Sequence, residues 1–410
     1  MKSHTRNILL LAGVVLIALF FIISNKYNLP VAIPNESEDI PTIKFDAPIF
    51  ISPISDLGLD TSTLSGYFSL APDGSKILFN GMGTDDEVHT AVAHLDTGSV
   101  EDLEGNLLSG WVDSDLVVLT SNTDIVLHDF KTDKIYTIPS DGNMYQGSLS
   151  PDRKWYVYHT QQGLRLFNLD TQAVTVLSTN NYDGAHAWYA DSKHILGYRG
   201  TDENLFEAGK GKQLAIWDIE TKTYQDLHVT LPIHTLKYVE WLVPDHIARV
   251  VAGYDDGSHD YIVNIDKNMV VDLGDTSGML MGGIAIDQSL GLIAYVGPTY
   301  SISGDTKNSA KVYTFDGVIQ KEVPFAFSPD PNAYESRESV RILSDHELIY
   351  IKKNADKGSA ATASIIKLDL TTQEEITLRV VDASVKQIAV LPDHTAWITA
   401  DAKQFYIEKL

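Results

Sequence analysis

Five polar side chains stand on short segments that otherwise read as apolar strands, and their types can bind a ligand or move a proton. They are Gln146, His186, Glu240, Arg341 and Gln387. A histidine, a carboxylate and a guanidinium that converge on a channel could hold a small ligand or protonate it. The alternative is that these side chains only form the solvated wall of a pore. The set defines a candidate channel site and leaves both roles open.

Acidic residues gather in three predicted loops. The groups are Asp85, Asp86 and Glu87; Asp202, Glu203 and Glu207; and Asp255, Asp256 and Asp260 with His259. Carboxylates could bind Ca²⁺, which takes six to eight oxygen ligands. The segment "YDDGSHDY" (254–261) lacks the alternating ligand spacing of a calcium loop, so we expect no metal and interpret it as a solvated hairpin tip. The second and third groups remain candidate binding residues on a loop face.

Motifs for catalysis are missing from the sequence. It contains no G-x-S-x-G elbow, no H-E-x-x-H and no phosphate-binding G-x-x-x-x-G-K-[ST]. Without cysteine it has no disulfides, thiolate metal sites or cysteine nucleophiles. A formal charge of −24 repels nucleic-acid backbones. We expect no cofactor and a non-catalytic binding role. The alternative is a hydrolase or lyase that uses His186, Glu240 and Arg341.

A strand–turn–strand unit recurs along the chain and must position these side chains. Its first turn carries an acid eight times, at Asp73, Asp115, Asp152, Asp191, Asp245, Asp287, Asp345 and Asp393. A second Asp-led turn follows in each of seven units, so one unit has four short strands. A lone four-stranded sheet cannot cover both of its faces, whereas sheets stacked around an axis cover one another. We predict an all-β propeller of eight four-stranded blades, or seven if "WVDSDLVVLT" (111–120) is not a blade.

The two ends of the repeat and its long insertions carry further expectations. The eighth unit stops at "QFYIEKL" before a fourth strand, and residues 42–52 could donate that strand or form a loose linker.

Four long insertions, 198–213, 297–311, 328–340 and 352–364, fall on the face opposite the first turns. Lengthened loops on a rigid scaffold usually carry recognition, so this face is the preferred binding surface; neutral decoration is the alternative.

The turn motifs carry a family resemblance. "SLAPDGSKILF" (69–79) and "SLSPDRKWYVY" (148–158), with the later "NLDTQAVTVL" (168–177), resemble the repeats of TolB-like and WD-repeat-like propellers. Similar blades occur in the non-catalytic part of prolyl oligopeptidase-type enzymes. The resemblance covers about residues 60–410 and implies the propeller fold. Only Asp73 is followed by glycine, as is usual in the family.

The N-terminal segment predicts a membrane anchor. Sixteen apolar residues (8–23) follow Lys2 and Arg6, and no small-residue cleavage pattern comes after them. We expect a cytoplasmic tail at 1–7, a single transmembrane helix at 8–24, a proline-rich acidic linker at 25–48 and the propeller at 49–410 outside the cell membrane. The alternative is secretion after signal cleavage. The expected partner is a protein, a peptide or an envelope polymer.

Overall fold

The computed structural model describes residues 68–82, 88–95, 97–103, 110–120, 124–139, 145–200, 213–229, 231, 235–254, 257–275, 283–300, 306–325, 333–356, 362–400 and 405–410. The predicted anchor, the linker and the possible strand donor 42–52 lie outside these residues. In the ranges given, no helix is long and apolar enough to cross a membrane.

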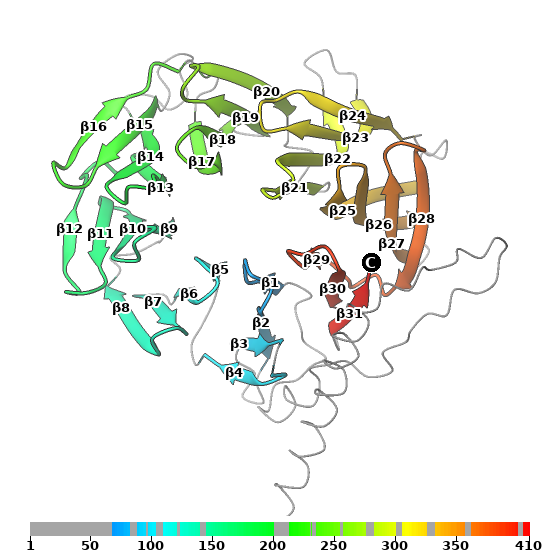
Figure 1. The fold of residues 1–410 in the computed structure, drawn as a ribbon, viewed down its shortest axis with the longest axis horizontal. Helices are drawn as coiled ribbons and strands as arrows, with labels where there is room; N and C mark the ends of the chain where they lie inside the picture. Colours follow the sequence, from blue (N-terminus) through cyan, green and yellow to red (C-terminus); the bar gives the residue numbers. More distant parts are fainter. Residues whose placement is uncertain are drawn as a thin grey trace, which may run out of the picture.

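Four consecutive antiparallel sheets form the first half of a ring (Figure 1). Blade 1 holds β1 (Phe68–Leu70), β2 (Lys76–Met82), β3 (Val88–His94) and β4 (Val100–Asp102). Blade 2 holds β5 (Gly110–Trp111), β6 (Leu116–Thr120), β7 (Asp124–Asp129) and β8 (Lys134–Pro139). Blade 3 holds β9 (Tyr145–Leu149), β10 (Trp155–Thr160), β11 (Gly163–Asn168) and β12 (Val174–Val176). Blade 4 holds β13 (Gly184–Trp188), β14 (His194–Arg199), β15 (Gln213–Asp218) and β16 (Thr223–Asp226).

The second half of the ring repeats this order and ends on a shorter sheet. Blade 5 holds β17 (Thr235–Val243), β18 (Ile247–Tyr254), β19 (Gly257–Asn264) and β20 (Met269–Asp275). Blade 6 holds β21 (Gly283–Asp287), β22 (Leu292–Tyr300), β23 (Thr306–Thr314) and β24 (Ile319–Pro324). Blade 7 holds β25 (Ala333–Ser344), β26 (Glu347–Asp356), β27 (Thr362–Asp369) and β28 (Glu374–Val381). Blade 8 holds β29 (Ile388–Val390), β30 (Ala396–Ala400) and β31 (Phe405–Lys409).

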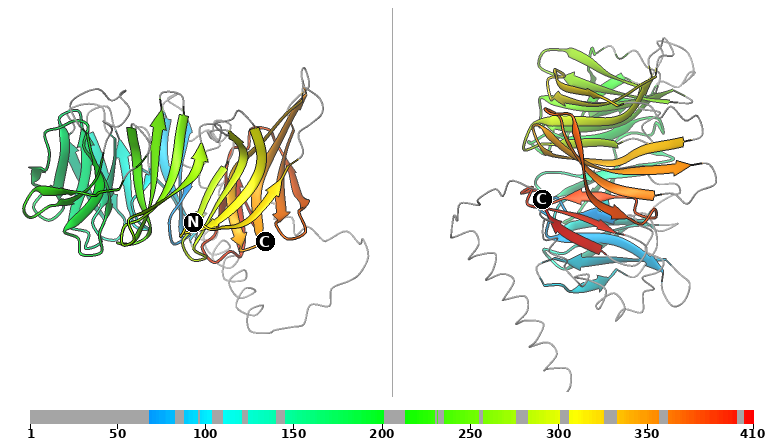
Figure 2. Two further views of the ribbon diagram at one scale, coloured as in Figure 1. Left: turned by 90° about the horizontal axis from the view of Figure 1, so that it is seen from above. Right: turned by 90° about the vertical axis from the view of Figure 1, so that its right-hand side faces the viewer.

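This arrangement confirms the eight-bladed reading. "WVDSDLVVLT" supplies β5 and β6, so the count of seven is wrong. The last blade has three strands among the described residues, as the truncated eighth unit predicts. Seen edge-on, the strands run along the axis of the ring, and the innermost strand of each blade faces the centre (Figures 1 and 2).

Apolar residues on alternate positions of one strand pack against different neighbours, which explains the ring. In β10, Tyr156 and Tyr158 pack toward blade 2, whereas Val157 packs toward blade 4. Each of the eight seams between adjacent blades has its own buried cluster of this kind. Since side chains alternate between the two faces of a strand, one period-two pattern covers both faces of every sheet.

Aromatic packing closes the ring between the last blade and the first. The Phe405 ring in β31 meets the rings of Phe68 and Phe79 edge-on, both at 5.4 Å between centroids. The Phe68 amide also donates a hydrogen bond to the side-chain oxygen of Gln387, at 3.2 Å. Blades 8 and 1 are therefore in direct contact through side chains of the described strands.

Three of the recurring acids show how a first turn is shaped. The carboxylates of Asp73, Asp191 and Asp393 each accept a hydrogen bond from the amide two residues later, at 2.9, 2.8 and 3.1 Å. The next residue takes the left-handed conformation, with φ of 74° at Gly74 and 57° at His394. Asx turns of this type hold the backbone locally, so the turn survives where glycine has been replaced.

The long insertions are partly strand and not wholly loop, which differs from the sequence-based expectation. Residues 297–300 and 306–311 continue the β22–β23 hairpin, with Tyr300 paired to Thr306. Residues 333–340 belong to β25, and 352–356 and 362–364 extend β26 and β27. The backbone N–H and C=O groups of these segments pair with the neighbouring strand, so these residues extend the blades.

Candidate binding site

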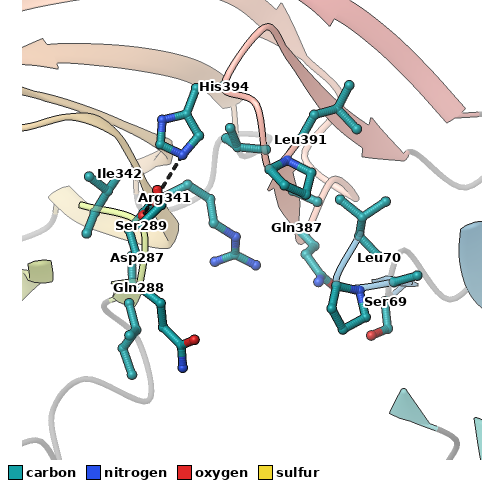
Figure 3. A pocket seen from close by; sticks show the side chains of 17 residues that line it. Ser69, Leu70, Asp287, Gln288, Ser289, Arg341, Ile342, Gln387, Leu391 and His394 are labelled. Atoms are coloured by element: carbon teal, nitrogen blue, oxygen red, sulfur yellow. Dashed lines mark hydrogen bonds and ion pairs between the residues drawn. The ribbon is translucent and has the colours of Figure 1, made fainter. Parts of the chain in front are cut away.

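A cavity of about 440 Å³ lies where four blades meet near the end of the channel that carries the first turns. Its wall comes from 69–72 of blade 1, 285–289 of blade 6, 341–342 of blade 7, and 387 with 389–392 and 394 of blade 8. Figure 3 shows the guanidinium of Arg341 between the first turn of blade 6 and the side chain of Gln387. The volume is within the range of small-molecule sites.

A β-bulge in the innermost strand of blade 7 sets the position of Arg341. The pairing of β25 with β26 shifts between Glu338 and Arg341, and Ser339 adopts a left-handed φ of 53°. The Ser339 hydroxyl accepts a hydrogen bond from the Ile388 amide at 2.7 Å, and so fixes this irregular backbone to blade 8. Bulges re-aim neighbouring side chains, and this one lies two residues before the arginine.

Arg341 has no acidic partner in the part of the chain that the structure describes. Its Nη1 donates one hydrogen bond to the Val340 carbonyl at 2.6 Å. Burial lowers the pKa of the guanidinium to about 10, and no ion pair with a described carboxylate offsets that effect. The group is still charged at neutral pH. A guanidinium has five N–H donors, so most of the hydrogen-bonding capacity of Arg341 is left for the cavity.

An ion pair lies beside this arginine. His394 Nε2, in the first turn of blade 8, is 2.7 Å from Asp287 Oδ2 at the end of β21 in blade 6. Burial acts to raise the pKa of Asp287, but hydrogen bonds from Ser289 and from the Leu290 amide, with the charge of His394, outweigh it and hold the pKa below its usual value. The pair thus connects two blades that are not neighbours and places an ionised carboxylate on the cavity wall.

Two amide side chains complete the polar lining. Gln387 uses its oxygen to accept the Phe68 amide, which leaves its NH₂ group as a donor. Gln288 donates its NH₂ group to the Trp241 carbonyl at 3.3 Å, which leaves its oxygen as an acceptor. The cavity therefore offers one cation without an acidic partner, neutral donors and acceptors, and one carboxylate–histidine pair.

The structure divides the predicted channel set into two groups. Arg341 and Gln387 line the same cavity. His186 and Glu240 lie elsewhere, on either side of Tyr238: the His186 ring is 5.7 Å from the Tyr238 ring, and the tyrosine hydroxyl is 3.5 Å from Glu240 Oε2. Gln146 lies on β9, and its side chain is outside the described part.

Glu240 belongs to a partly buried ion cluster with Arg249 and Asp260. Arg249 in β18 contacts Glu240 Oε1 through Nη1 at 2.6 Å and Asp260 Oδ1 through Nε at 2.9 Å. In the described residues, no interaction joins this cluster to Arg341. The Glu240 carboxylate is therefore held by a cation of its own blade.

The predicted loop-face group is only partly described. Asp202, Glu203, Glu207, Asp255 and Asp256 lie outside the described residues, as do Asp85, Asp86 and Glu87.

The position of His259 and Asp260 was wrongly predicted. Both lie within β19 and not at a solvated tip. Asp260 is 1% exposed because it faces Arg249, and His259 is 3.5 Å from Asp272. Strand pairing continues to Tyr254 and Gly257, and Asp260 pairs with Val251, so this acid lies within the blade.

Sequence reasoning missed Asp287, His394 and Gln288 as members of one site. His246 and His394 follow the turn acid in the same way, yet His246 pairs with Asp266 of its own blade. Spacing alone does not separate the two histidines. One signal in the sequence did single out Arg341. It stands four residues before its turn acid, a place that Trp111 and Trp241 hold in other blades. Those tryptophans donate to backbone carbonyls of the preceding blade, at Ser69 and Trp188.

Comparison with known proteins shows the fold. No protein-family model and no curated protein matches the chain. The Dos1 propeller superposes with a TM-score of 0.54 at 9% identity, covering 86% of this chain and 93% of that one. A eukaryotic initiation factor gives a TM-score of 0.51 at 9% identity, with 84% and 88% covered. TolB from Acinetobacter baumannii gives 0.36 at 12% identity, with 77% and 79% covered.

The ring itself, with the likeness to the Dos1 propeller and the initiation factor, defines the fold. The chain is an eight-bladed β-propeller, which is the fold that the turn motifs predict. Its candidate site is a polar cavity near one end of the central channel.

Proposed function

We propose that this propeller is a membrane-anchored binding module that faces outward from the cell and recognises a protein, peptide or envelope polymer without chemistry. The observation that carries this is the cavity among blades 1, 6, 7 and 8, which presents an uncompensated arginine and free amide groups. The acid and the histidine on its wall are engaged with each other, Asp287 with His394. Such a site suits recognition, since its titratable groups already have partners.

The anchor part of the proposal is supported by the sequence at 8–24 and by the acidic linker that follows. Leu16→Arg places a charge at the centre of the apolar run, which costs about 3 kcal/mol of insertion. We expect this variant to leave the membrane fraction. If it sediments with membranes as the parent chain does, the anchor is not at 8–24.

Site-specific photo-crosslinking in the producing cell tests the binding role. A benzophenone side chain in place of Pro392, on the rim of the cavity, should form adducts with the full chain. The control position is Ile135 on β8, which is 64% exposed on the outer edge of blade 2. Adducts at Pro392 and none at Ile135 support a ligand at this end of the channel. Equal labelling at both positions, or none at Pro392, contradicts it.

A hydrolase or lyase remains the second candidate because the Asp287–His394 pair lies beside Arg341 in the same cavity. A histidine oriented by a carboxylate can act as a general base. Incubating the captured ligand with the full chain separates the two roles. A new product that is absent with His394→Ala identifies an enzyme, whereas unchanged ligand identifies a binding module.

A further inference from the structure

Arg341 differs from nearly all the other arginines of the described part. Seven arginines are described, and five of them form ion pairs with carboxylates: Arg153, Arg199, Arg249, Arg337 and Arg379. Only Arg165 and Arg341 donate to backbone carbonyls alone. Of these two, only Arg341 lines the cavity. A chain with a formal charge of −24 therefore leaves one lining guanidinium without an acid.

The remaining donors of that guanidinium favour a planar anion. Arginine presents parallel N–H groups that match a carboxylate or a phosphate. Asp287 is on the same wall, in contact with His394, and its carboxylate disfavours a ligand with two negative charges. The other donors near Arg341 are neutral, such as the Gln387 NH₂ group. One cation with neutral partners balances a single charge, so the cavity fits a carboxylate better than a phosphate dianion.

The cavity also has room for more than the charged group. A volume of about 440 Å³ exceeds that of a carboxylate, and the free oxygen of Gln288 can accept an amide N–H of the same ligand. Carbon atoms of Ala285, Ile342 and Leu391 line the wall between the polar groups. The lining is therefore suited to a short segment that carries amides and small apolar groups next to a carboxylate.

We propose that Arg341 and Gln387 form a carboxylate-binding subsite in the channel, and that the ligand is a single carboxylate on a small molecule or at the C-terminus of a peptide. The inference rests on the proposed function and names the chemistry that the same cavity recognises. Arg341 supplies the charge and two of its N–H groups, and the Gln387 NH₂ group donates beside them. The bulge at Ser339 holds the guanidinium in place before the ligand arrives.

Binding of matched peptides to the full chain in lipid nanodiscs tests this. The probes are N-acetyl-trialanine with a free C-terminal carboxylate and the same peptide with a C-terminal amide, titrated by calorimetry. We expect the free acid to bind at least tenfold more tightly than the amide. Arg341→Gln should remove this preference, and Arg341→Lys, which keeps the charge without the planar fork, should lose part of it. Arg165→Gln is the matched control and should bind as the parent chain does.

Two further probes, acetate and inorganic phosphate, test the source of the carboxylate and the type of anion. If acetate competes with the tripeptide, the subsite accepts free carboxylates; if it does not, the peptide chain is required, and both results agree with the proposal. Inorganic phosphate should bind more weakly than the free acid.

The inference is overturned if acid and amide bind alike, if neither binds, if phosphate is preferred, or if a folded Arg341→Gln variant, with an unchanged melting temperature, still prefers the acid. If adducts still form at Pro392 in any of those cases, the proposed binding role stands, and only the inference that the ligand carries a carboxylate is withdrawn.

Discussion

Two arginines in this ring, Arg249 and Arg341, carry the same group in opposite surroundings. Arg249 in blade 5 lies between Glu240 and Asp260, at 2.6 and 2.9 Å. Burial alone would lower its pKa, but the charges of Asp260 and Glu240 more than reverse this and raise it. Arg341 in blade 7 has only a carbonyl partner, and its pKa falls to about 10.

The difference shows which of the two arginines holds the fold together and which has N–H groups available for a ligand. The charge of Arg249 is balanced by acids of its own blade, so its removal leaves one buried and one partly buried carboxylate without a cation. The charge of Arg341 is balanced by nothing described, so its removal leaves no ion behind. Stability should therefore report on the first arginine, and ligand binding on the second.

The largest expected effect comes from breaking the neutralised cluster. Arg249→Met should lower the free energy of unfolding by about 3–5 kcal/mol, because the buried Asp260 and the partly buried Glu240 lose their cation. Urea denaturation followed by circular dichroism measures this. Adding Asp260→Asn and Glu240→Gln should recover part of the loss. A loss below about 1 kcal/mol would mean that the cluster is solvated and that the contrast with Arg341 is false.

A smaller effect is expected where the wall beside Arg341 is tightly packed. A Cβ added at Gly283 in β21 would lie 2.3 Å from Val340 Cγ2 and 2.6 Å from the Val340 amide nitrogen. Gly283→Ala should therefore cost about 1–3 kcal/mol through overpacking, and it should weaken the acid-over-amide preference by moving the strand that carries Arg341. Gly110→Ala, with nothing within 4 Å of its Cβ, is the matched control. Unchanged stability and preference would show that this strand can adjust freely.

Removing the uncompensated cation itself should change stability little. Arg341→Met deletes a partly buried charge whose one partner is a carbonyl, so we expect a shift within about 1 kcal/mol, in the stabilising direction if any. The same urea titration provides the measurement. A loss comparable with that of Arg249→Met would indicate an ion pair that holds Arg341 in place, and the two arginines would then have one role.

The smallest effect concerns the Asp287–His394 pair and depends on pH. The pKa of Asp287 is lower in the folded chain than its ordinary value of 3.8, so its carboxylate stabilises the fold above that value. This contribution is lost as the pH falls through the lowered pKa. Asp287→Asn should cost less than about 1 kcal/mol at neutral pH, and its difference from the parent chain should shrink below about pH 4. A difference that grows on acidification would mean the opposite sign of shift.

The sequence allowed the fold to be predicted more fully than the site, for physical reasons. The turn acids and the period-two strands are local signals, and all eight acids from Asp73 to Asp393 lie at or beside first turns. The site depends on which blades approach one another at the channel end. The contact between His394 and Asp287 spans 107 residues and two blades, and no local pattern encodes it. Arg341 and Gln387 were found by residue type, whereas Asp260 was assigned to a hairpin tip because Arg249 was not recognised as its partner.

The aromatic contact of Phe405 with Phe68 and Phe79 has a consequence for how the molecule comes apart. A linear stack of repeats has two outer units that each lack a neighbour and fray first. Here the last blade rests on the first, so every blade is flanked on both sides and fraying has no free edge from which to start. Unfolding of this chain must begin by rupturing a seam.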